Sequence, residues 1–244
     1  MNNVCFIPAR GGSKGVRGKN MRRLDGTPLV GITIKAAIQS EIFRAIYVST
    51  DCPMTHEYAE SMGCNSFRMR PWNKEIGMQS ANELICSEMK DIQSQEWKTV
   101  NLWYLQPTSP FRTLEDFRTI ERMANVLAEG ESVISFREVG CDEHYMWQFK
   151  KVAEYIEPVS VEEVVPRRQE LQGAYVRDGA FYISRAGDIL KNRKLVQSKI
   201  LGYIRSGFHV NIDSENDWIE AKRLCAEFSL SQRESQTSDW KNIA

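Results

Sequence analysis

Four glycines and a cluster of cations follow a short apolar run near the start of the chain. The run, residues 4–8, is typical of a buried strand, and ARGGSKGVRGKN follows it at residues 9–20. Glycine permits close backbone approach, so such a loop can turn free amides toward an anion while the cations add charge. The loop is therefore predicted to hold a nucleoside triphosphate. Its candidate groups are the amides of Gly11 and Gly12 and the side chains of Arg10, Ser13, Lys14 and Lys19, with Arg17 and Arg22 or Arg23 as further cations.

This loop matches neither of the common phosphate-binding motifs. Gly18 and Lys19 are followed by Asn20, and Ser13 stands where a Walker P-loop has its first glycine. The sequence also lacks GxGxxG, which disfavours an NAD-dependent dehydrogenase. The remaining alternative is a basic surface turn between a strand and a helix.

The elements expected around the loop alternate between strands and helices. Apolar residues recur at helical spacing from Leu29 to Ile38, between runs typical of strands at 4–8 and 45–49. Further helices are expected at 55–62, 80–92, 115–127 and 215–228, and further strands at 66–69, 100–105, 133–136 and 179–184. The pattern predicts an α/β fold with a doubly wound, mostly parallel sheet, whose ligands bind beyond the carboxyl ends of the strands. Arg10 and residues 49–51 and 106–109 lie at such ends.

Residues 141–175 break this alternation with short β-like pieces and scattered charges. We interpret them as an inserted arm between a parent domain of residues 1–140 and 176–229, with a poorly ordered polar tail at 230–244. Exposed aromatic and apolar side chains on the arm would be buried by a partner subunit, which predicts a homodimer; alternatively they pack on the parent domain. These side chains are Tyr145, Met146, Trp147, Phe149 and Tyr155.

Composition limits the classes of function. Lys plus Arg equals Asp plus Glu, 32 against 32, so no nucleic-acid partner is expected and the cations of residues 10–23 form a local site. The sequence has no apolar run near the roughly 20 residues that span a bilayer and no signal-peptide core, which predicts a soluble, cytoplasmic protein without a membrane partner. The six cysteines and three histidines lack the spacing of a zinc site, and no cysteine is paired with a base.

Five motifs, in order, resemble those of the CMP-sialic acid synthetases, which are acylneuraminate cytidylyltransferases. After the loop and its following YVSTD (47–51) come LQPTSPFRT (105–113), PRRQ (166–169), RDGAFY (177–182) and NIDSENDW (211–218), so the resemblance covers nearly the whole chain. It implies a nucleotidyltransferase-type fold and an arm that makes the dimer contact and reaches the neighbouring active site. It also implies transfer of a cytidylyl group from CTP to a nine-carbon sugar acid, with release of pyrophosphate.

That reaction requires positioned reactants and neutralised phosphate charge. The candidate catalytic residues are Arg10, Lys19 and Asp213, and the resemblance implies that Lys14, Asn20 and Arg70 also contact CTP. The aspartate that the family carries after Arg70 is missing, so Ser80 or Asn82 are its candidate substitutes, with an ordinary loop as the alternative.

The sugar acid has two groups of candidate residues. Gln106, Thr108 and Ser109 lie in a turn stiffened by two prolines, although Thr108 or Ser109 could instead cap the helix that begins near Leu114. A guanidinium group binds a carboxylate in bidentate fashion, and three arginines are candidates for that role. They are Arg167, Arg168 and Arg177.

The resemblance also implies a magnesium site. The family binds the ion with two aspartates, and here the corresponding residues are Asn211 and Asp213. An amide weakens such a site without abolishing it, because Mg²⁺ prefers charged oxygen ligands. Asp217 is expected in the first turn of the last helix without a catalytic role.

Two alternatives to a sialic acid cytidylyltransferase remain: a CMP-KDO-type synthetase and a non-catalytic nucleotide-binding homologue. The phenylalanine pair that often contacts the acyl group in bacterial relatives is absent at residues 192–195. The sugar could therefore be sialic, legionaminic or pseudaminic acid.

Overall fold

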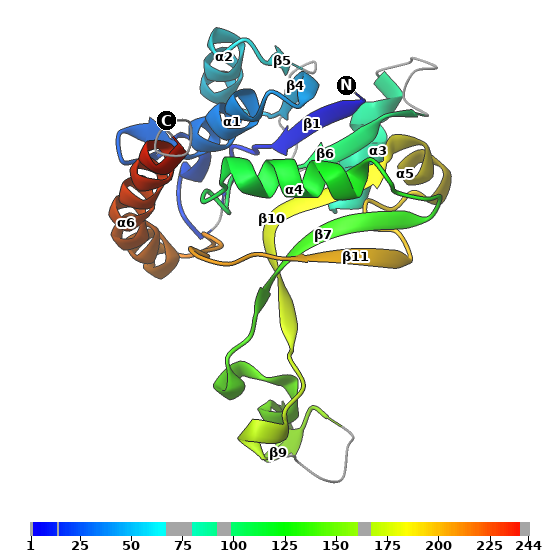
Figure 1. Ribbon diagram of the computed structural model, residues 1–244, viewed down its shortest axis with the longest axis vertical. Coiled ribbons are helices and arrows are strands. Elements are labelled where there is room, and N and C mark those ends of the chain that lie inside the picture. Colours follow the sequence, from blue (N-terminus) through cyan, green and yellow to red (C-terminus); the bar gives the residue numbers. More distant parts are fainter. Residues whose placement is uncertain (1, 14, 67–79, 92–98, 161–166, 240–244) are drawn as a thin grey trace.

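A mostly parallel sheet forms the centre of the protein (Figure 1). This computed structural model describes residues 2–13, 15–66, 80–91, 99–160 and 167–239, and within them the sheet has seven strands in the order β11-β7-β10-β6-β1-β4-β5. Among the neighbouring pairs in this part of the chain, the two that involve β10 are antiparallel. The strands are β1 (Asn3–Pro8), β4 (Phe43–Ser49), β5 (Asn65–Ser66), β6 (Asn101–Tyr104), β7 (Glu131–Glu138), β10 (Tyr175–Arg185) and β11 (Lys199–Ile204). The predicted α/β fold class is confirmed.

Helices pack on both faces of this sheet. Successive residues of a strand point to opposite faces, so Cys5 and Ile7 of β1 enter one apolar cluster while Val4 and Phe6 enter another. Both clusters are buried, which explains the unbroken apolar run of β1. The first cluster includes residues of α1 (Leu29–Ser40), α2 (Pro53–Ser61) and α4 (Leu114–Ala124), and the second includes residues of α3 (Ala81–Asp91) and α5 (Ala186–Asn192).

The last helix, α6 (Glu215–Asp239), packs against the start of the chain. Its Trp218 is buried with Leu24 of the two-stranded sheet formed by β2 (Arg23–Leu24) and β3 (Thr27–Pro28). The guanidinium of Arg22 lies 4.4 Å from the centre of the Trp218 ring and 2.6 Å from Oε1 of Glu215. The helix ends at Asp239, later than the expected end near Phe228, because neither proline nor glycine interrupts the sequence between these residues.

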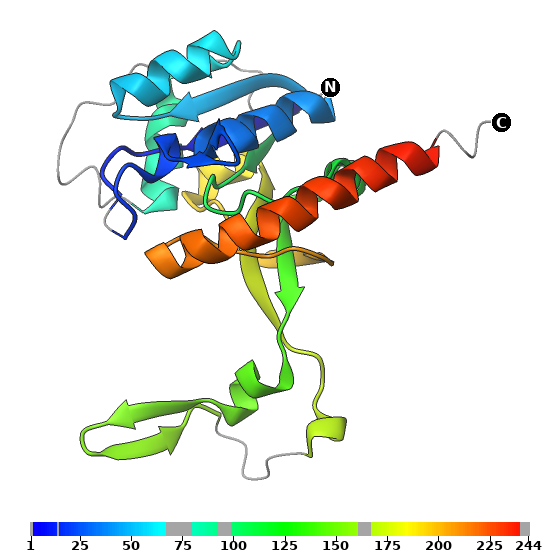
Figure 2. The same cartoon turned by 90° about the vertical axis from the view of Figure 1, so that its left-hand side faces the viewer.

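Residues between β7 and β10 stand away from the sheet (Figures 1 and 2). They contain the 3₁₀ turns η4 (Cys141–Glu143), η5 (Tyr145–Trp147) and η6 (Arg168–Glu170) and the hairpin of β8 (Phe149–Val152) and β9 (Tyr155–Pro158). An ion pair of 3.1 Å between Arg137 and Glu143 lies at the base. This shape agrees with the expected arm, which we call by that name below, while the division into domains stays a prediction.

The arm leaves most of its apolar side chains exposed. Trp147 is 40% exposed, Phe149 59% and Tyr155 75%, on a segment that stands away from the parent domain (Figures 1 and 2). The expectation was wrong for Met146, which is buried inside the arm, with the hydroxyl of Ser160 3.2 Å from its sulfur. No helix within the described ranges is both long and apolar enough to cross a membrane.

Candidate active site

The glycine-rich loop leaves β1 where the sheet order reverses. β1 lies between β4 and β6, and ligands of doubly wound sheets bind beyond the strand ends at such a point. The backbone of Ala9 is held there twice, because its amide donates to the carbonyl of Ser49 at 2.8 Å and its carbonyl accepts from Thr50 Oγ1 at 2.7 Å. The start of the loop is therefore fixed to the end of β4.

Two side chains shape the loop from within. The amide of Asn20, a residue that is only 7% exposed, donates to the carbonyl of Arg10 at 2.8 Å. The Gly11 amide donates to Oδ1 of Asp51 at 2.6 Å. Asn20 thus acts on the loop conformation, and Asp51 is a loop contact to which the sequence analysis gave no role. Lys14 lies outside the described residues.

The loop meets the segment of residues 211–213 directly. Lys19 Nζ lies 2.5 Å from the carbonyl oxygen of Ile212 and 3.0 Å from Oδ1 of Asp213. A Cβ added to Gly15 would lie 1.8 Å from the carbonyl oxygen of Asp213, so only glycine permits this approach. The loop and the predicted metal segment, about 190 residues apart in sequence, therefore form one site.

The segment itself offers one carboxylate and one amide. Asp213 is exposed, with Oδ2 accepting from the Asn211 amide at 2.9 Å, while Asp217 accepts from the amides of Asp213 and Ser214 at 3.0 and 2.7 Å. Asp217 therefore lies in the first turn of α6, as expected, and accepts from the backbone at the start of the helix. The described residues contain no cluster of three or more His, Cys, Asp or Glu suited to a metal. Because Mg²⁺ is commonly held by one or two carboxylates plus substrate phosphates, this donor set fits an ion shared with a triphosphate.

Gln106 and Arg177 line a cavity of about 300 Å³ beyond β6. Tyr104, Tyr182 and Lys194 line it as well, and the described residues of its lining include no carboxylate, so it favours an anionic ligand. Beside it, Gly179 adopts a φ of +77°, and a Cβ there would lie 2.7 Å from Oγ of Ser109, 3.1 Å from Oε1 of Gln106 and 3.6 Å from Oδ1 of Asn211.

Thr108 and Ser109 both contact other parts of the protein. The cap of α4 is Thr113, whose Oγ1 accepts from the Asp116 amide at 3.0 Å, so the alternative that Thr108 or Ser109 caps this helix is wrong. Ser109 is buried and donates to the carbonyl of Asp178 at 2.9 Å, and Thr108 accepts through its carbonyl from the Ile212 amide at 2.9 Å.

The segment after Arg70, where Ser80 and Asn82 are the candidate substitutes for the family aspartate, is described only in part. Arg70 lies outside the described residues. Ser80 forms a reciprocal cap with Glu83 at the start of α3, with distances of 2.8 and 3.3 Å to the backbone amides involved. Asn82 accepts from the Leu195 amide at 2.8 Å, so its side chain oxygen holds the loop beside the cavity. Both candidate substitutes for the family aspartate thus have protein partners.

The three candidate arginines for the sugar carboxylate are separated within one chain. Arg177 is exposed beside Gln106, whereas Arg167 and Arg168 lie at the turn η6, in the part of the arm farthest from the sheet (Figures 1 and 2). One chain does not bring all three to the same cavity.

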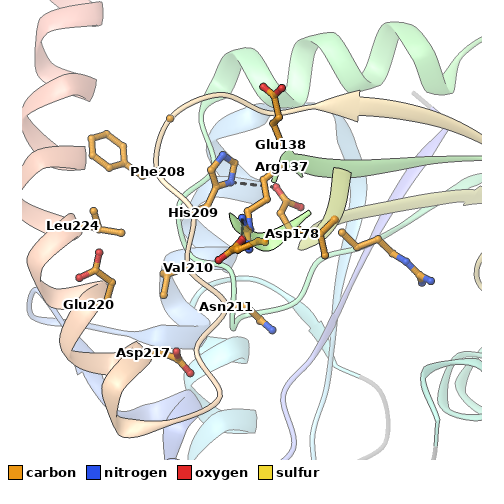
Figure 3. A pocket seen from close by; sticks show the side chains of 14 residues that line it. Arg137, Glu138, Asp178, Phe208, His209, Val210, Asn211, Asp217, Glu220 and Leu224 are labelled. Carbon is orange, nitrogen blue, oxygen red and sulfur yellow. Dashed lines mark hydrogen bonds and ion pairs between the residues drawn. The ribbon is translucent and has the colours of Figure 1, made fainter. Parts of the chain in front are cut away.

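A second cavity, of about 620 Å³, lies between the base of the arm and α6 (Figure 3). Beneath it is a buried charge cluster that the sequence analysis missed, in which Asp178 contacts Arg205 at 2.8 Å and His209 at 3.6 Å. Burial and the neighbouring Arg205 lower the pKa of Arg112 to about 9. Asp178 lies inside the RDGAFY motif, which is the signal that could have singled it out.

Comparisons with known proteins agree with this geometry. The sheet order and the helices on both faces define a doubly wound α/β fold, with the glycine-rich loop at the point where the strand order reverses. A family model described as cytidylyltransferase matches residues 4–203, so the chain belongs to the cytidylyltransferase family.

Among curated relatives, the chain is 29% identical over 241 residues to the N-acylneuraminate cytidylyltransferase of Streptococcus agalactiae serotype V, covering 97% of this chain and 56% of the relative. It is 27% identical over 230 residues to the CMP-N,N'-diacetyllegionaminic acid synthase of Legionella pneumophila, covering 92% and 96%. The chain therefore spans about half the length of the streptococcal relative and nearly all of the second.

Two solved structures show the same fold. The CMP:2-keto-3-deoxy-manno-octonic acid synthetase, complexed with CTP, superposes with a TM-score of 0.68 at 18% identity, covering 93% of this chain and 99% of the other. The 4-diphosphocytidyl-2C-methyl-D-erythritol synthase of Anaerococcus prevotii gives 0.60 at 12% identity, covering 91% and 96%.

Proposed function

We propose that this protein activates a nine-carbon nonulosonic acid with CTP, giving the CMP-sugar and pyrophosphate in the cytoplasm. The observation that carries the proposal is that the glycine-rich loop, Gln106 and residues 211–213 meet beyond the carboxyl ends of the central strands, with Lys19 3.0 Å from Asp213. The names of the streptococcal and Legionella relatives support a sialic or legionaminic acid as the substrate.

The residues of the loop are assigned to CTP. A sugar hydroxyl attacks the α-phosphorus while pyrophosphate leaves, so negative charge moves toward the leaving group. In our proposal Arg10, Ser13, the Gly12 amide and Lys19 bind the triphosphate, and Asn20 keeps the carbonyl of Arg10 away from it. The Gly11 amide, expected to contribute as well, instead donates to Asp51. Preorganised cations and amides stabilise such charge without reorganising during the reaction.

Gln106 and Arg177 are assigned to the sugar acid in the neighbouring cavity. A guanidinium can bind the sugar carboxylate with two hydrogen bonds, and the side chain amide of Gln106 can both donate and accept. Asp213, with Asn211 turned to present its oxygen, would hold Mg²⁺ together with CTP phosphates, and the ion would neutralise phosphate charge.

The activity is tested by chromatography of CMP-sugars and by pyrophosphate release. The purified chain is incubated with CTP, Mg²⁺ and one of four acids: N-acetylneuraminic, N,N'-diacetyllegionaminic, pseudaminic or 3-deoxy-manno-octulosonic acid. We expect both products with a nine-carbon acid and neither product without sugar. Preference for the eight-carbon acid would identify a KDO-type enzyme, and CTP binding without product would identify a non-catalytic homologue.

We also propose a homodimer formed through the arm, with Arg167 or Arg168 completing the sugar site of the partner. The exposed apolar side chains of the arm support it, because a monomer would leave Phe149 and Tyr155 in water.

Sedimentation of the wild type at micromolar concentration is expected to give a dimer. Replacing Phe149 and Tyr155 with serine removes apolar contact area and should shift the protein to monomers and lower its activity. Val126→Ser is the control, because Val126 is 75% exposed on the parent domain. A fully active wild-type monomer would overturn both the role of the arm and the shared site.

A further inference from the structure

Asp178 is a buried carboxylate beside the candidate site. Its side chain is 1% exposed, and Oδ1 accepts from the hydroxyl of Ser135 and from the Ala180 amide at 3.0 Å. Oδ2 lies 2.8 Å from the guanidinium of Arg205. It also lies 3.6 Å from Nδ1 of His209, a pair joined by the dashed line in Figure 3. Burial alone would raise the pKa of this carboxyl group, but His209, Arg205, Ser135 and the Ala180 amide together outweigh it and hold the pKa well below its usual range. Asp178 is therefore a buried anion.

The backbone around Asp178 forms a bulge in β10. Arg177 pairs with Phe136 and Tyr182 with Ile134, so the four residues 178–181 lie opposite the single residue Ser135. The bulge is held from the side of β6, because Ser109 donates to the carbonyl of Asp178 at 2.9 Å. Since Asp178 directly follows Arg177, the conformation of the bulge determines the position of the Arg177 guanidinium relative to Gln106.

The same carboxylate also holds the segment that leads to Asn211 and Asp213. Arg205 and His209 precede these residues in a stretch without helix or strand, which runs from the end of β11 to α6. Arg205 is further fixed by the carbonyl of Phe111 and by Asp116 at 3.4 Å. A stretch of this kind takes its position from its side-chain contacts, and the contacts with Asp178 are among those nearest the site.

We infer that Asp178 is a positioning residue. It fixes the position of Arg177 and Gln106, on the sugar side of the site, relative to Asn211 and Asp213, on the phosphate side. This inference rests on the proposed function. Asp178 touches neither reactant, and its effect passes through the β10 bulge on one side and through Arg205 and His209 on the other.

Asp178→Asn tests this role in the full chain, with CTP, Mg²⁺ and the sugar acid that the wild type uses. Asparagine keeps the volume but loses the charge that faces Arg205 and His209. We expect kcat to fall about 10- to 100-fold, with a rise in both the KM for the sugar acid and the Mg²⁺ concentration needed for half-maximal activity. Arg177→Ala should raise only the KM for the sugar acid, and Asn211→Asp should change only the Mg²⁺ concentration needed for half-maximal activity.

Asp188→Asn is the matched control. Asp188, on α5, is also buried, and it accepts from the Gly130 amide at 3.0 Å. It should leave kcat and both constants within about twofold of the wild type, whatever its melting temperature. If Asp178→Asn lowers only the melting temperature, or moves only one of the two constants, the inference is overturned.

If Asp178→Asn fails to fold, Ser135→Ala, which removes one hydrogen bond to the carboxylate, must shift both constants by a smaller factor; unchanged constants would reject the role. Wild-type CMP-sugar formation in the same assay decides the proposed function separately.

Discussion

Replacing Lys19 with methionine is expected to lower turnover by at least about tenfold while the fold is kept, which corresponds to ~1.4 kcal/mol of lost transition-state stabilisation. Methionine retains an unbranched apolar stem, so the change mainly removes the ammonium group. That group lies 3.0 Å from Asp213 on a side chain that is only 12% exposed, where its charge is screened less than in open solvent. Steady-state kinetics give turnover, and circular dichroism gives the fold.

Lys35→Met is the matched control for this change. Lys35 is an exposed lysine on α1 whose Nζ lies 3.3 Å from Thr27 Oγ1, away from the glycine-rich loop, and its loss should leave turnover unchanged. Arg10→Ala should behave as Lys19→Met does, because both cations belong to the proposed triphosphate site. Wild-type turnover in both loop variants would return the loop to the alternative of a basic surface turn.

The central strands and helices could be predicted because their burial leaves a clear pattern. The apolar runs of β1 and β6 reflect two covered faces, and α4 is amphipathic, although its cap at Thr113 was not predicted. β11 and α5 were not predicted. β11 lies at the sheet edge with its apolar residues partly exposed and Gly202 in the middle, and α5 has only seven residues. Neither segment shows the repeat of apolar residues, every second residue in a strand or every three to four in a helix, by which a half-buried element is recognised.

The residue types of the candidate site could be predicted from the sequence, but most of their contacts could not. Glycines and cations indicate phosphate binding, but nothing local in sequence reveals that Gly15 touches the backbone of Asp213 or that Lys19 reaches it. Likewise, Arg22 belongs by composition to the cationic loop, yet it pairs with Glu215 and stacks on Trp218. Such long-range contacts depend on how α6 packs, which periodicity does not encode.

The largest loss of activity is expected for Asp213→Ala. Asp213 is the carboxylate that would hold Mg²⁺ with the CTP phosphates, and it is also the partner of Lys19 at 3.0 Å. Alanine removes both contributions at an exposed position, so the enzyme should be nearly inactive while its melting temperature changes little. Activity that survives the loss of Asp213, or chelation of the metal, would mean that the ion is bound elsewhere or not used.

Asn211→Asp should have the opposite effect on the metal requirement. The side chain of Asn211 already lies 2.9 Å from Asp213, and aspartate replaces its amide with a second anionic oxygen ligand of nearly the same volume. Two carboxylates attract Mg²⁺ more strongly than one, so half-maximal activity should be reached at a lower Mg²⁺ concentration without loss of the enzyme. A magnesium titration of CMP-sugar formation in the wild type and both variants measures this shift. An unchanged or higher requirement in Asn211→Asp would place the ion away from residue 211, because an added charge beside a bound cation must tighten its binding.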